Sequence, residues 1–258
     1  MDNTSIKFFG TTACIFDKND DDPCFLVNNK YLFDTGFAVV NNLVNNDINP
    51  TSIKYLFFTH MHHDHYISLP ALLFYYLQTG ARLEELTILG PSRDVARIVD
   101  KAMDFIEAKT CWQTNGPKVV ELDCGYSFET EDMLFETVSS VHPVQGLCYR
   151  MTDKNTGKVI CATGDTTVND KLPQFFAGCD ALIHEISLGM YRNTGGYATS
   201  NGHSSVYEAV DLANVTGAKQ LFFVHNSRKI EKEVLAYAKG NFKGEKAVWP
   251  AVGHTYCI

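Results

Sequence analysis

The chain has 258 residues, of which 45% are hydrophobic and 20% are charged, an ordinary composition for a globular protein with a sizeable core. Its net charge is −8, from 22 Lys and Arg against 30 Asp and Glu, and it has no basic run, which argues against a general nucleic-acid binder. No stretch approaches the roughly 20 apolar residues of a membrane span, and the first ten residues lack the basic segment and long apolar run of a secretion signal, so none is expected. The eight cysteines occur singly, as expected of reduced cysteines in a cytoplasmic protein.

The first half of the chain begins with patterns typical of an antiparallel sheet. Strands are expected over residues 6–16, 24–29 and 30–36, and a short helix over 41–50. Strands and helices then alternate. The expected order is a strand over 53–60, a helix over 69–80 that ends at Gly80, a strand over 86–90, and a helix over 91–108 with Pro91 in its first turn.

The second half repeats this alternation in a looser form. Its expected strands are 135–142, 159–165, 180–185 and 221–225, and its expected helices are 205–215 and 229–240. Ser205 and Glu208 form an S-x-x-E capping box at the start of the first of these helices. The pattern predicts sheets covered by helices, in a single domain over residues 1–258.

Several of the predicted strands end in a potential metal ligand. These ends are His60, His142, Asp165, Glu185 and His225, and the loop after His60 adds His62, Asp64 and His65. One histidine at a strand end is usually a structural residue, but ligands outside the carboxyl ends of several strands converge on one crevice. Imidazole and carboxylate donors suit zinc and its neighbours. The sequence therefore predicts a metal site.

The segment HMHHDH carries the H-x-H-x-D-H signature of the metallo-β-lactamase superfamily, which the chain resembles also at FDTG, TGDT and LFFVHNS. The resemblance implies an α/β fold, an αββα sandwich with a dinuclear metal site at the edge of the sheets. It assigns His60, His62, His142 and Asp165 to one ion, and Asp64, His65, His225 and a bridging Asp165 to the other. His63 stands at a variable position of the signature. Zn²⁺ is the favoured ion, and Mn²⁺ or Fe would also fit this donor set.

Two further segments, IHEIS and GHSSVYEAVDLA, resemble the ribonuclease Z-like phosphodiesterase branch of that superfamily. The resemblance implies that His203 donates a proton to the leaving alkoxide and that Glu185 orients it, with Asp64 also among the catalytic residues. A general acid with a pKa near the working pH suits a poor leaving group of this kind. His184 is expected to be structural, because it points to the other side of its strand from Glu185.

Only 22 residues separate His142 from Asp165, which leaves room for a hairpin but not for a long tRNA-binding arm. We therefore expect a small nucleotide phosphodiester, including a cyclic nucleotide, as the substrate, cleaved by a hydroxide held between the two ions. An arm-less RNA 3′-processing endonuclease and a carboxylic ester, lactone or thioester hydrolase stay open as alternatives. Tyr66 and Trp112 are candidates for stacking on a base, and His254 is a candidate for approaching the site. Relatives of this branch often form homodimers, so a homodimer is expected.

Overall fold

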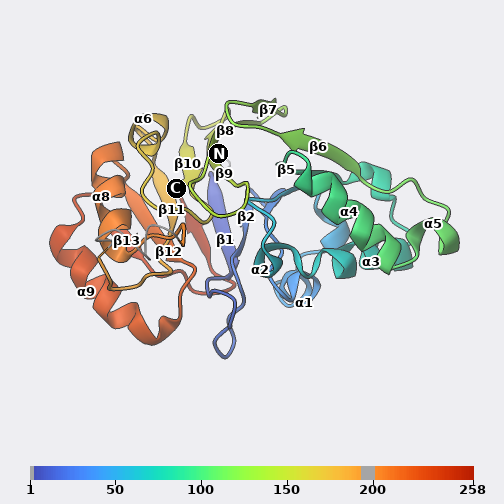
Figure 1. Cartoon of the computed structure of the whole chain (residues 1–258), viewed down its shortest axis with the longest axis horizontal. Coiled ribbons are helices and arrows are strands. Elements are labelled where there is room, and N and C mark those ends of the chain that lie inside the picture. Colours follow the sequence, from blue (N-terminus) through green and yellow to red (C-terminus); the bar gives the residue numbers. More distant parts are fainter. Residues whose placement is uncertain (1–2, 193–200) are drawn as a thin grey trace.

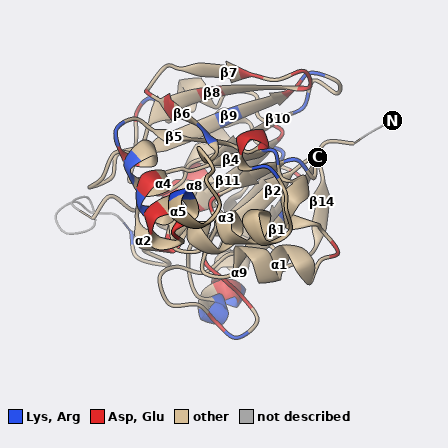
Figure 2. Cartoon of the chain, turned by 90° about the vertical axis from the view of Figure 1, so that its right-hand side faces the viewer, with Lys and Arg blue, Asp and Glu red and all other residues tan. Residues whose placement is uncertain are grey.

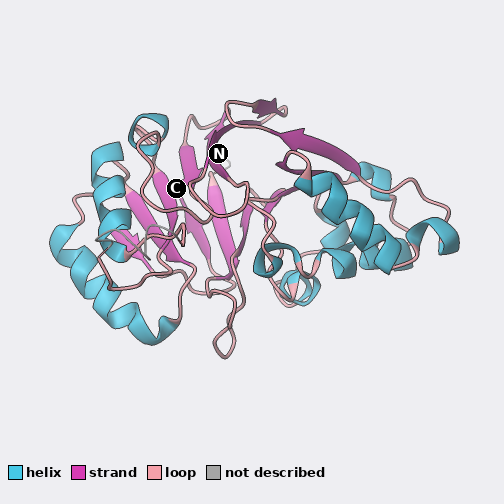
Figure 3. Cartoon of the chain, in the orientation of Figure 1, coloured by secondary structure: helices cyan, strands magenta, loops and turns pink. Residues whose placement is uncertain are grey.

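Two sheets lie face to face, and helices cover the outer face of each (Figures 1 and 3). The computed structural model describes residues 3–192 and 201–258. The arrangement is an αββα sandwich, which confirms the predicted fold class. Among the described residues, no helix is long and apolar enough to cross a membrane.

The first sheet combines strands from the first half of the chain with one strand from its C-terminal end. In spatial order its strands are β14 (Thr255–Cys257), β1 (Ser5–Gly10), β2 (Cys24–Val27), β3 (Tyr31–Phe33), β4 (Tyr55–Phe57), β5 (Thr87–Pro91) and β6 (Lys118–Leu122). The pairings from β14 to β3 are antiparallel, and those from β3 to β6 are parallel.

The second sheet also has antiparallel pairings on one side and parallel pairings on the other. Its strands are, in spatial order, β7 (Ser127–Glu129), β8 (Met133–Ser139), β9 (Leu147–Asp153), β10 (Val159–Ala162), β11 (Ala181–Glu185), β12 (Gln220–Val224) and β13 (Lys246–Val248). The pairings from β7 to β10 are antiparallel, and those from β10 to β13 are parallel.

Helices connect the parallel strands and cover the outer faces. On the side of the first sheet they are α1 (Val39–Val44), α2 (His63–Tyr66), α3 (Leu69–Gln78), α4 (Asp94–Phe105) and α5 (Ala108–Cys111). On the side of the second sheet they are α6 (Leu172–Phe175), α8 (Val206–Thr216) and α9 (Glu231–Asn241). Short 3₁₀ helices lie at Pro50–Ser52, Leu83–Glu85 and Arg228–Ile230.

Strand alternation divides the buried apolar side chains into three layers. In β4, Leu56 packs under the helices of the first sheet, whereas Phe57 lies between the two sheets. Phe57 stacks on Phe33 of the neighbouring strand, with ring centroids 4.9 Å apart. In β11, Ile183 faces the inter-sheet core and Leu182 faces the helices of the second sheet. Burial of apolar surface on both faces is what holds such parallel strands in place.

One sequence prediction at the start of a helix is wrong. Pro91 is the last residue of β5, where it pairs with Leu122, and α4 begins three residues later at Asp94. Proline is tolerated at such a position because the end of a strand does not require every ladder hydrogen bond. The capping box of α8 is confirmed, with Ser205 as the N-cap residue and Glu208 reaching back to its backbone N–H.

Candidate metal centre

Four of the expected ligands meet at one edge of the sandwich. The donor atoms of His60, His62, His142 and Asp165 all lie within 4.8 Å of one another. His62 Nδ1 is 3.1 Å from His60 Nε2 and 3.0 Å from His142 Nε2. His60 is held there by a bridge to Gly146, which joins the end of the first sheet to the second. The loop after β4 therefore delivers its histidines to the partner sheet.

A second group of donors lies beside the first. The donor atoms of Asp64, His65 and His225 also lie within 4.8 Å of one another. Asp165 Oδ2 stands between the groups, 3.6 Å from His60 Nε2, 3.6 Å from His65 Nε2 and 3.3 Å from His225 Nε2. One carboxylate is thus placed to serve both groups, as a bridging ligand requires.

The residues of both groups fit divalent cations. His65 Nε2 is buried and has no hydrogen-bond partner among the described residues, an unusual state for a polar atom in a protein interior. Burial lowers the pKa values of His60, His62 and His142, which keeps these imidazoles neutral and able to offer a lone pair. A set of neutral imidazoles and carboxylates suits zinc and similar ions.

The electrostatic field of the second group also favours a cation. Burial alone would lower the pKa of His65, but the carboxylates of Asp34 and Asp165 raise it well above its usual value. Burial opposes the ionisation of Asp165, yet His225 and His65 hold its pKa well below the usual range. The Asp165 carboxylate therefore stays charged and attracts positive charge to this position.

Asp34, in the FDTG turn after β3, fixes the orientation of His65. Its carboxylate accepts hydrogen bonds from His65 Nδ1 at 2.9 Å, from the Thr59 backbone N–H at 2.9 Å and from the Thr59 hydroxyl at 2.8 Å. Because Nδ1 is the donor in this bond, the lone pair of His65 is on Nε2, which faces the other ligands. Such partners commonly fix the tautomer of a ligand histidine.

Gly202 has the same role for His142, and sequence reasoning missed it. His142 Nδ1 donates to the Gly202 carbonyl oxygen at 2.8 Å, which leaves Nε2 for the metal site. Gly202 has a φ of +69°, and a Cβ there would stand 2.7 Å from His142 Cα and 2.8 Å from Nδ1. Only glycine permits this approach.

Ser187 is a third such partner that the sequence did not reveal. Its hydroxyl oxygen lies 2.5 Å from His225 Nδ1, so Nε2 of His225 again faces the site. His225 has a φ of +66°, and its backbone N–H donates to the Thr11 carbonyl at 2.7 Å. A positive φ in a histidine that ends a strand is strained, and such strain is often found at functional sites.

His203 forms a pair with Glu185 at the rim of the ligand groups. His203 Nδ1 lies 3.1 Å from Glu185 Oε1. The buried Glu185 carboxylate also accepts hydrogen bonds from the backbone N–H groups of Ser204 (2.9 Å), Thr166 (3.2 Å) and Ser187 (2.7 Å). Burial lowers the pKa of His203, but the carboxylates of Glu185, Asp165 and Asp64 together raise it above its usual value.

His203 also belongs to a third possible donor group, with Asp165 and His225. Its Nδ1 is 3.9 Å from Asp165 Oδ2, farther than it is from Glu185. Since Glu185 accepts a hydrogen bond from the Nδ1–H group, the geometry fits proton transfer through the other ring nitrogen, Nε2, better than metal binding through Nδ1.

These groups open into a pocket of about 410 Å³. Its described lining residues are Cys14, Phe37, His62, His63, Asp64, Asp165, His203 and His225. Cys14, which sequence reasoning did not single out, donates from Sγ to Asp64 Oδ2 at 3.3 Å. None of these lining residues is Lys or Arg.

The remaining sequence candidates are not among the described lining residues of this pocket. Tyr66 packs against the apolar layer under the first-sheet helices, and Trp112 makes an edge contact with Phe74 in a different hollow. Neither is a described lining residue of the metal pocket, but the Tyr66 ring lies 5.5 Å from the ring of His63, which is one, so base stacking by these residues stays a prediction. The exposed ring of His254 lies against Tyr256.

The chain matches the family described as "Beta-lactamase superfamily domain" over residues 29–226. It is 24% identical to ribonuclease Z of Bacillus subtilis (strain 168) over 249 residues, covering 78% of this chain and 79% of that protein.

Two solved structures share the fold over nearly the whole chain. One is the metallo-beta-lactamase fold protein YhfI from Bacillus subtilis, with a TM-score of 0.82, 21% identity, and 99% of each chain covered. The other is human tRNase Z, short form, with a TM-score of 0.76, 22% identity, and 98% of this chain and 99% of that chain covered. The family match spans well over half of the chain, which therefore belongs to the beta-lactamase superfamily and is a metal-dependent hydrolase.

Proposed function

We propose that this protein is a dinuclear-metal phosphodiesterase that hydrolyses a small nucleotide phosphodiester, including cyclic nucleotides. The observation that carries the proposal is the His203–Glu185 pair, held at 3.1 Å at the rim of two adjacent ligand groups. A hydrolase of esters with better leaving groups has less need of a positioned general acid than a phosphodiesterase does.

The proposal assigns the two ligand groups to two Zn²⁺ ions. His60, His62 and His142 would hold one ion, and Asp64, His65 and His225 the other, with Asp165 between them. Bound dications would neutralise charge on the phosphoryl oxygens and lower the pKa of a water. Because the ligands come from both sheets, the proposal treats residues 1–258 as one functional domain.

His203 supplies the proton that the leaving oxygen needs. Glu185 accepts a hydrogen bond from Nδ1, which directs Nε2 and its proton away from Glu185. Three backbone N–H groups hold the Glu185 carboxylate, so the imidazole has a fixed partner and a fixed orientation. A positioned acid of this kind contributes about 10²- to 10⁴-fold to the rate.

The size and charge of the pocket support a small substrate. Its volume of about 410 Å³ lies in the range of small-molecule sites, and its described lining has no Lys or Arg. Figure 2 shows Lys and Arg mixed with Asp and Glu on the side that carries α3, α4 and α5. A long polyanion would be expected to need a basic surface beside the site.

The proposal includes a homodimer. Phe105 is 79% exposed and Phe74 is 42% exposed, and both line an apolar hollow formed by α3 and the end of α4. Exposed apolar side chains gathered in one place are typical of interaction surfaces.

The proposal is tested by turnover of a panel of 3′,5′-cyclic nucleotides by the zinc-loaded protein. We expect hydrolysis, and we expect His203→Ala to lower kcat by about 10²-fold or more while both zinc ions stay bound. His254→Ala is the matched control, because this histidine is exposed and lies outside the pocket. Full activity in His203→Ala would contradict the proposed acid.

A second candidate is an RNA 3′-processing endonuclease, which the similarity to ribonuclease Z of Bacillus subtilis favours. Cleavage of a precursor RNA by the zinc-loaded protein, with no turnover of any cyclic nucleotide, would replace the first proposal by this one.

A further inference from the structure

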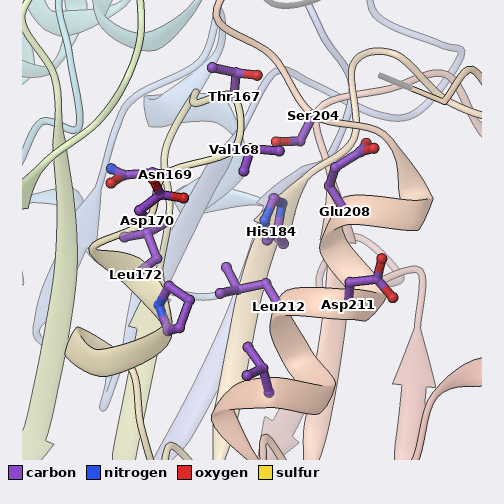
Figure 4. A pocket seen from close by; sticks show the side chains of 12 residues that line it. Thr167, Val168, Asn169, Asp170, Leu172, His184, Ser204, Glu208, Asp211 and Leu212 are labelled. Carbon is purple, nitrogen blue, oxygen red and sulfur yellow. The ribbon is translucent and has the colours of Figure 1, made fainter. Parts of the chain in front are cut away.

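A second cavity, of about 310 Å³, lies between α6, α8 and the loop that joins β10 to α6 (Figure 4). Its walls are largely apolar, from Val168, Leu172 and Pro173 on one side and Leu212 and Val215 on the other. It shares no described lining residue with the metal pocket, and β11 lies between the two. Its volume is at the lower end of the range for small-ligand sites.

The only aromatic ring in the described lining of this cavity, that of His184, is almost fully buried, with 2% of the residue exposed. Successive side chains of a strand point to opposite faces, so His184 faces the helices while Glu185 faces the metal site. Figure 4 shows the His184 ring in the cavity, facing α8.

His184 presents an unpaired hydrogen-bond acceptor in the cavity. Its Nδ1 donates to the Glu185 carbonyl oxygen at 2.6 Å, so the neutral ring has its lone pair on Nε2. Burial lowers the pKa of this histidine and favours that neutral form. No described residue makes a hydrogen bond to Nε2. A ligand in the cavity that carries an N–H donor can therefore donate to this acceptor.

The charges at the cavity favour a cation. Asp170, Glu208 and Asp211 are among its described lining residues, and no Lys or Arg is. Glu208 is close enough to His184 to raise its pKa, against the larger effect of burial. The same carboxylate caps α8 through the backbone N–H of Ser205 at 2.8 Å, which fixes its position.

We propose that this cavity is a second ligand site, which binds a small organic ammonium with an apolar body. The ammonium N–H donates to His184 Nε2, the carboxylates of Asp170 and Asp211 balance its charge, and the apolar body packs between Leu172 and Leu212. The same carboxylates would repel an anion. A polar zwitterion is disfavoured because its second charge would be buried against the apolar walls.

The test is a titration of the full-length, zinc-loaded protein with benzylammonium, followed by NMR of ¹³C-labelled Leu and Val methyl groups. We expect saturable shifts at Val168, Leu172 and Leu212, and none at Val44 on α1. Benzoate, which has nearly the same shape and the opposite charge, should leave these methyl groups unshifted at the same concentrations.

Two variants locate the site. Val168→Trp fills the cavity from its exposed side, since Val168 is 57% exposed, and should weaken binding at least tenfold. Val44→Trp is the matched control at a valine that is 48% exposed, and it should keep the affinity. His184→Leu removes the acceptor and should weaken binding at least tenfold. If His184→Leu does not fold, the affinity of Val168→Trp for benzylammonium alone tests the proposal. Equal binding of benzoate, or unchanged affinity in Val168→Trp, would overturn the proposal.

Discussion

At the scale of single residues, three ligand histidines each use one ring nitrogen for a partner and the other for the site. The Asp34 carboxylate accepts a hydrogen bond from Nδ1 of His65, and the Gly202 carbonyl oxygen accepts one from Nδ1 of His142. Ser187 lies beside Nδ1 of His225. The ligands are therefore oriented before any ion binds, which raises metal affinity, and loss of such a partner typically costs 10- to 100-fold.

Gly202→Ala should reduce zinc binding at the group that contains His142. The new Cβ would meet His142 Cα and Nδ1 at 2.7 and 2.8 Å, so the ring must move away from His62. We expect a loss of 10-fold or more in affinity for one of the two ions, measured by competition with a zinc chelator.

Gly217→Ala is the matched control for this prediction. Gly217 has a φ of +73° at the end of α8, but a Cβ there would meet nothing within 4 Å. This variant should lose about 1 kcal/mol of stability and keep both ions. Equal zinc loss in both variants would show that strain in the loop, and not the position of His142, sets the affinity.

The sequence predicted the candidate ligands but not the residues that orient them. Four ligands lie within six positions of one loop, and the others end apolar runs, so their pattern is visible in the chain itself. Gly202 meets His142 across 60 residues, and Ser187 meets His225 across 38. Such contacts depend on how two loops pack, which no local pattern encodes.

At the scale of elements, Asp180 joins the beginnings of three parallel strands. Just before β11, its side chain accepts a hydrogen bond from the Val159 N–H of β10 at 2.9 Å, and its backbone carbonyl accepts from the Gln220 N–H of β12, also at 2.9 Å. Burial opposes the ionisation of Asp180, but Lys219, at 2.7 Å, and Lys158 hold its pKa below the usual value. One carboxylate thus supports the register that carries Asp165, Glu185 and His225 to the site.

Asp180→Asn should lower the free energy of unfolding by about 2 kcal/mol at pH 7, because a charged acceptor is lost. The pKa is lower in the folded than in the unfolded protein, so this stabilisation is complete above the unfolded value of about 4 and is lost as the pH falls through the folded value. Urea unfolding is measured from pH 7 to pH 3. The difference in free energy of unfolding between the parent protein and Asp180→Asn should become smaller below about pH 4.

Asp100→Asn is the control for this prediction, because the Asp100 side chain is 73% exposed and its contact with Lys109 is 4.0 Å long. Its stability should stay within about 0.5 kcal/mol of the parent protein at every pH. If the difference in free energy of unfolding between the parent protein and Asp180→Asn did not change with pH, the loss of stability would come from the changed shape of the side chain and not from its lost charge.

Element boundaries were predictable where a local signal marks them. The capping box marks the start of α8 within the chain itself, and it is seen in the structure. Pro91 was misplaced because its role depends on β6, a strand that the sequence pattern did not reveal. A proline at the end of a strand and a proline in the first turn of a helix give the same local pattern.

At the scale of the whole molecule, the candidate metal centre lies where the two sheets meet. His60, His62, Asp64 and His65 follow β4 of the first sheet, whereas His142, Asp165 and His225 follow β8, β10 and β12 of the second. The bridge between His60 and Gly146 and the bond from the Tyr149 hydroxyl to the Phe58 carbonyl, at 2.7 Å, join the sheets near the site. Ions bound there would therefore link the two sheets.

Removal of the metal should for this reason destabilise the entire fold and not only the site. An ion that binds the folded chain at a concentration of 100 times its Kd adds about 2.7 kcal/mol, which corresponds to roughly 5–10 °C in Tm for a chain of this size. The measurement compares thermal unfolding of the zinc-loaded and chelated protein. In Asp165→Asn, which weakens the carboxylate between both groups, the difference in Tm should be at most half as large. Equal Tm values for the loaded and chelated parent protein would mean that the sheets hold together without the ions, and that the donors serve chemistry alone.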